Sequence, residues 1–107
     1  MKEIKAFVHR NRIADVIHAL RDAGFGDLSV VDVLGMLRAL DPREARYSME
    51  LGERVTAEVK LELVCEDGRV EEAVRLIREN ARTGQHPAGW IYVYDVAAAH
   101  PIDGGGA

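Results

Sequence analysis

The chain has 107 residues, a formal net charge of −4 and one cysteine, Cys65. This length suits a single domain with one hydrophobic core. The acidic balance argues against nucleic-acid binding, which needs a positive surface. A lone cysteine excludes an intrachain disulfide, and the chain has neither an apolar run of about 18 residues nor an apolar leader, so we expect a cytoplasmic protein.

The first third of the chain contains two predicted strands and the helix between them. Apolar residues alternate along 2–8, which predicts a strand. Apolar residues at helical spacing predict a helix over 12–23, with Asn11 as its N-cap and Gly24 at its end. A second strand is expected over 28–34.

The remaining elements follow a polar stretch over 38–54. Residues 55–65 alternate between apolar and charged side chains, which predicts a third strand. Asp67 is the expected cap of a second helix. The apolar stripe of that helix consists of Val70, Ala73, Val74 and Ile77. A fourth strand is predicted over 89–96.

The order β-α-β-β-α-β predicts an α+β, ferredoxin-like domain over 1–97, followed by a tail over 98–107. In this fold two helices cover one face of a four-stranded antiparallel sheet. The last strand is apolar on both faces, with Trp90, Tyr92 and Tyr94 on the face opposite Ile91 and Val93. We expect self-association to bury these aromatic side chains, the alternative being a surface cluster of purely structural origin.

The segment over 82–93 is predicted to be a turn-rich loop that leads into the last strand. Thr83-Gly84 and Gly89 leave backbone N–H groups that can approach an anion closely. The sequence therefore places a candidate anion site at this loop.

Residues 1 to about 97 resemble the PII signal-transduction proteins without gaps. The matching segments are 1–6, 15–20, 23–25, 28–35, 59–64, 81–84 and 91–93, together with Arg38, Asp67, Val70 and Gly89. The resemblance implies a homotrimer with ligand clefts between subunits. Since the sequence contains no evident Ser-His-Asp or carboxylate constellation, we expect no enzymatic activity. The resemblance also implies a B-loop over 83–89 and a protruding T-loop over 37–55 that docks on a protein or membrane transporter. The expected partner-binding residues are Arg43, Arg46, Tyr47 and Met49.

The resemblance further implies an adenine nucleotide between subunits. The residues assigned to it are Gly35, Arg38, Glu62, Val64, Thr83, Gly84, Gly89 and Trp90, with Phe7, Ser29 and Cys65 in the region of the base and ribose. Arg38 would face the terminal phosphate.

The phosphate clamp departs from the family pattern. Trp90 replaces a lysine, Pro87 and Ala88 replace a Gly-Asp pair, and Pro101 and Asp103 replace two arginines. Each charge-assisted hydrogen bond contributes roughly 1.5–3 kcal/mol, so losing three cationic donors weakens triphosphate binding by about three decades or more. We therefore expect ADP or AMP as the effector rather than ATP.

Other ligands of the family are also affected. Ala39 replaces a glutamine that helps hold magnesium and 2-oxoglutarate, and Glu58 replaces a lysine that pairs with the 2-oxoglutarate carboxylate. These changes predict that 2-oxoglutarate sensing is absent. They resemble those of PII-like proteins linked to carboxysomes and bicarbonate uptake, which suggests bicarbonate near Arg38 or Arg46.

Two alternatives remain open. One is a metal-related trimer resembling the copper-tolerance relatives of PII, in which His86 and His100 could meet across a subunit interface. The other is a structural trimer that has lost every ligand. Since no histidine pair has a zinc-ligand spacing with Cys65, we expect no metal.

Overall fold

The computed structural model describes residues 1–32, 58–84 and 88–104. The four strands of these segments are β1 (Lys2–His9), β2 (Leu28–Asp32), β3 (Glu58–Cys65) and β4 (Gly89–Asp95), and the two α-helices are α1 (Ile13–Asp22) and α4 (Val70–Ala81). The parts of the predicted second and third strands at 33–34 and 55–57 lie outside the described residues.

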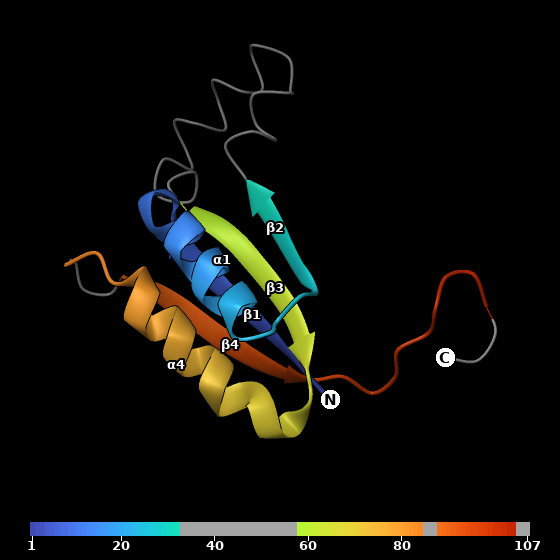
Figure 1. Ribbon diagram of the computed structural model, residues 1–107. Helices are drawn as coiled ribbons and strands as arrows, with labels where there is room; N and C mark the ends of the chain where they lie inside the picture. Colours follow the sequence, from blue (N-terminus) through green and yellow to red (C-terminus); the bar gives the residue numbers. More distant parts are fainter. Residues whose placement is uncertain (33–57, 85–87, 105–107) are drawn as a thin grey trace, which may run out of the picture.

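The strands form one antiparallel sheet in the order β2-β3-β1-β4. Both helices lie on the same face of it, and the opposite face has no covering element among the described segments (Figure 1). This arrangement confirms the predicted ferredoxin-like fold. The central strand β1 joins the two halves, since it pairs with β3 on one side and β4 on the other.

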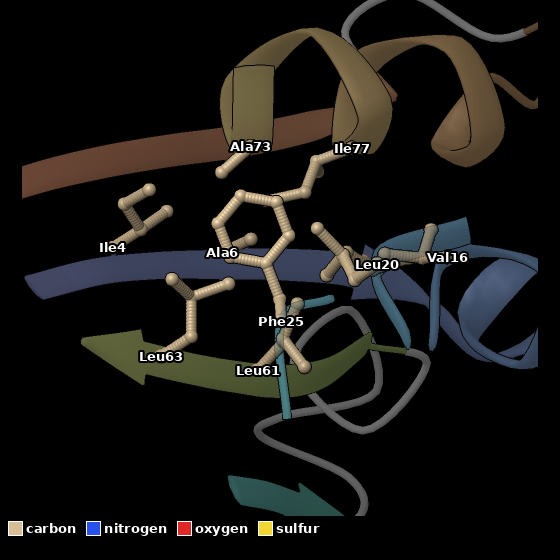
Figure 2. Close-up of a cluster of buried hydrophobic side chains, with 10 residues drawn as sticks. Ile4, Ala6, Val16, Leu20, Phe25, Leu61, Leu63, Ala73 and Ile77 are labelled. Carbon is tan, nitrogen blue, oxygen red and sulfur yellow. The ribbon is translucent and has the colours of Figure 1, made fainter. Parts of the chain in front are cut away.

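The core lies between the sheet and the helices. β1 contributes Ile4, Ala6 and Val8, and the predicted alternation of β3 contributes Val59, Leu61 and Leu63; all six are at most 2% exposed. Figure 2 shows Ala73 and Ile77 of α4 pointing toward the sheet, with the ring of Phe25 among them. The core therefore forms where every second residue of the strands packs against every third or fourth residue of the helices.

The end of α1 is formed as predicted, through a glycine. Gly24 has φ +93°, and the amide of Gly24 donates to the carbonyl of Arg21 while the amide of Phe25 donates to that of Leu20. These two bonds form a Schellman motif, which requires a left-handed residue that glycine adopts without strain. The motif also turns Phe25 into the core, where it is 5% exposed.

The predicted helix N-caps are wrong. Asn11 lies inside a 3-10 turn over Arg10–Arg12, and its amide donates to Nδ1 of His9, which caps that turn. Asp67 likewise lies in a 3-10 turn over Asp67–Arg69, and its carboxylate accepts from the N-terminal amine at 2.6 Å. Each short turn displaces the start of the α-helix by a few residues, so the polar residue next to the strand no longer meets the free helical amides.

An arginine stands immediately before each α-helix and caps the other helix. Nε of Arg12, before α1, donates to the carbonyl of Asn80 near the end of α4 at 2.9 Å. The guanidinium of Arg69, before α4, donates to the carbonyl of Ala23 at the end of α1 at 2.7 Å. A cation at a helix C-terminus satisfies an unpaired carbonyl and opposes the helix dipole. The two caps thus tie the start of each helix to the end of its neighbour.

The predicted boundaries differ slightly from those observed. β1 continues to His9 because it pairs with Glu58 of β3, one residue beyond the predicted end. β4 ends at Asp95 rather than residue 96, since Lys2 is its last partner on β1. The amide of Val96 still donates to the carbonyl of Met1, which holds the residue after β4 beside the sheet.

Candidate functional site

The uncovered face of the sheet carries an exposed aromatic row on β4. Trp90, Tyr92 and Tyr94 are 61%, 43% and 47% exposed. Tyr92 meets Phe7 edge-on, with ring centroids 6.1 Å apart, and the ammonium of Lys5 lies 5.3 Å from the centre of the Tyr94 ring. The prediction that these three aromatic residues share one face, away from the helices, is confirmed.

Charged side chains form a second group on the same face. The carboxylate of Glu62 on β3 forms two ion pairs. Its Oε1 lies 3.1 Å from Nζ of Lys60 and 3.9 Å from Nζ of Lys5 on β1. All three side chains are partly buried. This group fixes the position of the Glu62 carboxylate, which sequence reasoning assigned to the nucleotide site.

A hollow of about 440 Å³ opens beside Glu62. It is lined by Glu3, Gly26, Asp27, Leu28, Ser29, Glu62, Leu63 and Val64. The three carboxylates would repel phosphate, whereas they and the Ser29 hydroxyl can accept hydrogen bonds from amino and hydroxyl groups. We call this hollow the carboxylate hollow; its chemistry suits a base or sugar. It unites three predicted site residues, namely Ser29, Glu62 and Val64.

Cys65 lies beside the carboxylate hollow, at the end of β3. It lines an adjoining hollow with Phe25 and Arg69 and packs against the core, though it is only partly buried. Desolvation is the main cause that raises the pKa of its thiol. A thiol held in its protonated form is a poor nucleophile, as expected for a residue that packs with the core.

The residues predicted to approach phosphate lie elsewhere in the fold. Thr83 and Gly84 follow the end of α4, and Gly89 begins β4. Both glycines have positive φ, +84° at Gly84 and +148° at Gly89. At Gly89 a Cβ atom would lie 2.2 Å from the carbonyl oxygen of Phe7. Gly89 is therefore required for the close pairing of β4 with β1, a role that sequence reasoning missed.

One chain does not bring the two groups together. Trp90 pairs with Phe7, which in turn pairs with Lys60, so these three form one row across the sheet. Glu62 and Val64 lie two and four residues beyond Lys60, on the far side of β1. Val64 is four residues along the strand and two strands across from Trp90. At about 3.3 Å per residue and about 4.8 Å between strands, the backbones of these two residues are roughly 16 Å apart. Thr83 lines a hollow with His9 and Asn11, which lie beyond Phe7 along the chain, so it is farther still from Val64.

The other predicted site residues cannot be placed. Gly35 and Arg38 of the nucleotide site, and Arg43, Arg46, Tyr47 and Met49 of the partner-binding loop, all lie outside the described residues. His86 does too, whereas His100 is exposed on the tail. Within the described segments no group of three or more His, Cys, Asp or Glu could hold a metal ion, and no helix there is long and apolar enough to cross a membrane.

A pocket of about 200 Å³ between α4 and β4 was not predicted. Its apolar floor and two arginines are contributed by Phe7, Val8, Ile77, Arg78, Ala81, Arg82, Ala88, Gly89, Trp90 and Ile91. We call it the α4–β4 pocket. The only sequence signal for it is that Ile77, Arg78 and Ala81 recur at helical spacing on the last turns of α4, with Arg82 directly after the helix.

The sheet order and the single helix-covered face define a ferredoxin-like α+β domain. Comparison with known proteins agrees. The family described as "Nitrogen regulatory protein P-II" matches residues 1–105. The chain therefore belongs to this family of regulatory proteins.

Individual relatives cover most of the chain. The chain is 35% identical over 96 residues to "Nitrogen regulatory protein P-II 1" of Methanothermobacter thermautotrophicus, which covers 90% of this chain and 84% of the relative. It is 33% identical over 97 residues to the Escherichia coli K12 protein of the same name, over 91% and 87% of the two chains. The solved structure of Arabidopsis thaliana PII bound to citrate superposes with a TM-score of 0.70 at 28% identity, over 95% and 82% of the chains.

Proposed function

We propose that the chain is a homotrimeric regulatory sensor that binds ADP or AMP in preference to ATP in clefts between subunits. In each cleft the carboxylate hollow of one subunit would hold the base and ribose. Thr83, Gly84 and Gly89 of another subunit would approach the phosphates, together with Gly35 and Arg38. The separation of these two groups within one chain is the observation that supports this arrangement, because a second chain could place its phosphate-approaching residues beside the hollow.

The preference for fewer phosphates rests on charge. Trp90, exposed at the phosphate end, provides no cation, and the tail residues Pro101 and Asp103 provide none either. Each further phosphate adds negative charge that these positions cannot neutralise. A monophosphate or diphosphate loses less binding free energy from that deficit than a triphosphate does.

Calorimetric titration of the intact protein with AMP, ADP and ATP tests this preference. We expect AMP or ADP to bind at least tenfold more tightly than ATP. ATP binding at micromolar affinity or better would overturn the proposal.

A charge-restoring variant isolates the cause. Trp90→Lys should strengthen ATP binding by about tenfold to a hundredfold, the equivalent of one charge-assisted hydrogen bond, and AMP binding much less. His18→Lys, which adds the same charge on the exposed side of α1, is the matched control and should leave all three affinities unchanged. An equal gain for the three nucleotides in Trp90→Lys would show that this position does not set phosphate preference.

Regulation would pass through residues 37–55, with Arg43, Arg46, Tyr47 and Met49 contacting a protein or transporter. Replacing residues 43–50 by a Gly/Ser linker should abolish capture of a partner that the intact protein captures, while ADP binding is kept.

Bicarbonate beside Arg38 or Arg46 is the second ligand of the proposal. Adding bicarbonate should tighten ADP binding, and an unchanged ADP affinity would contradict a bicarbonate site.

A further inference from the structure

We infer that the α4–β4 pocket receives the tail of a second copy of this chain, with Ile102 entering the pocket and Asp103 pairing with Arg78 or Arg82. This inference requires the self-association that the proposed function also requires, but it does not depend on nucleotide binding.

The pocket combines an apolar floor with a cationic rim. Val8, Ile77, Ala81 and Ile91 belong to the apolar part of its lining. Arg78 and Arg82 stand at its edge with exposed side chains, and neither has an ion pair or side-chain hydrogen bond to any residue in the described segments. In contrast, Arg75 on the same helix pairs with Glu79 at 3.3 Å. An occupant with an apolar group next to a negative charge would complement this pocket.

The tail presents such a pair. The amide of Gly104 donates to the carbonyl of Pro101 at 3.2 Å, which closes a turn with Ile102 and Asp103 at its tip. Ile102 is fully exposed. A scattered apolar side chain on a surface needs no explanation. Here, however, a hydrogen-bonded turn holds the apolar side chain beside a carboxylate, so docking costs less conformational entropy than it would for an open segment.

The size of the pocket favours a side chain over a metabolite. Sites for drug-sized ligands usually measure about 300–1,000 Å³, and this pocket measures about 200 Å³. One branched aliphatic side chain needs less room than such a ligand. Burying it would contribute roughly 1.5–3 kcal/mol by the general scale for aliphatic residues, so the tail would add to a larger interface rather than create one.

The tail of the same chain does not reach the pocket in the structure. The pocket lies at Gly89, where β4 begins, whereas the tail leaves at Asp95, where β4 ends (Figure 1). That strand is roughly 20 Å long at about 3.3 Å per residue. The segment from Asp95 to Ile102 could span at most about 25 Å when fully extended, and it would also have to reverse its direction. In the structure it instead runs away from the sheet.

Disulfide trapping tests the inference in a Cys65→Ser background. Tagged chains carrying Ile102→Cys are mixed with untagged chains carrying Ala81→Cys, the subunits are exchanged, and the thiols are oxidised without nucleotide. We expect a covalent product of one tagged and one untagged chain, since a disulfide needs Cα atoms within about 7 Å. Tagged chains carrying Ala98→Cys, at an exposed position of the same tail, are the matched control and should give little of this product.

A second set of variants tests the proposed ion pair between Asp103 and an arginine of the pocket. Asp103→Arg should slow formation of the mixed product about two- to fivefold, the range expected for one exposed ion pair, and Arg82→Asp on the untagged chain should restore it. Mixed oligomers in which Ile102→Cys links no better than Ala98→Cys would overturn the inference while leaving the proposed function intact. A disulfide within one chain, in a variant carrying both cysteines, would overturn it as well. A strictly monomeric protein would contradict both proposals.

Discussion

At the scale of single residues, Gly89 illustrates how one position can have two separate reasons for its identity. Sequence reasoning assigned it to an anion-binding loop because glycine amides approach anions closely. The structure gives it a packing reason, since its φ of +148° and the carbonyl of Phe7 leave no room for a side chain. This packing requirement applies whether or not a ligand binds there.

Gly89→Ala should therefore destabilise the fold by about 2–3 kcal/mol, because the new Cβ must displace the backbone of β1 or β4. Urea denaturation at fixed protein concentration measures the change. Gly26→Ala is the matched control, as nothing lies within 4 Å of its Cβ position and its φ is not in the left-handed range; its unfolding free energy should change by less than about 1 kcal/mol. Similar effects of the two substitutions would contradict this account of Gly89.

At the scale of elements, the helices are joined by their reciprocal arginine caps. Of the two arginines, Arg69 makes contacts of three kinds. Its guanidinium lies 3.9 Å from the centre of the Phe25 ring, donates to the carbonyl of Ala23 and pairs with Glu72 at 2.7 Å. One side chain thus holds the start of α4, the end of α1 and the core residue that follows α1.

Arg69→Ala should lower the free energy of unfolding by about 1–2 kcal/mol, since a charged hydrogen bond and a stacking contact are lost. Arg75→Ala provides the comparison, because it removes an arginine of the same helix whose partner, Glu79, is exposed at i+4; its cost should be below about 0.5 kcal/mol. The free energies of unfolding of the two variants are obtained from the midpoints and slopes of their denaturant titrations. Equal costs would mean that the cap to Ala23 contributes nothing measurable.

At the scale of the whole molecule, the two faces of the sheet differ in kind. One face is covered by α1 and α4 and forms the core. The other presents Trp90, Tyr92 and Tyr94 of β4 with Phe7 of β1, and the ion-paired Glu62 lies across β1 from them. An aromatic face of this sort typically marks a surface that associates with a partner. It is the physical basis for proposing that copies of the chain assemble through it.

Tyr92→Glu should dissociate the proposed trimer, because it places a carboxylate within an apolar interface. Size-exclusion chromatography with light scattering should give three times the chain mass for the unaltered protein and a smaller mass for the variant. Glu71→Gln, on the exposed side of α4, is the control and should keep the larger mass. A monomeric unaltered protein, or a Tyr92→Glu protein of unchanged mass, would contradict assembly through this face.

The sequence by itself determined the order of the elements, the buried face of each and the family. It could do so because periods of two and of 3.6 residues dictate which side chains share a face, as the alternation of β3 and the stripe of α4 demonstrate. The aromatic row on β4 was predictable for the same reason. These properties depend on neighbours along the chain.

Only the tertiary structure decided the contacts between segments far apart in the sequence. It placed Asn11 and Asp67 in short 3-10 turns instead of at helix N-caps, and it brought Arg12 and Arg69 to the C-terminal carbonyls of the opposite helix. It separated Glu62 and Val64 from Thr83 and Gly84, and it formed the α4–β4 pocket. Such features arise from strand register and helix docking, which bring together residues whose spacing along the chain carries no periodic signal.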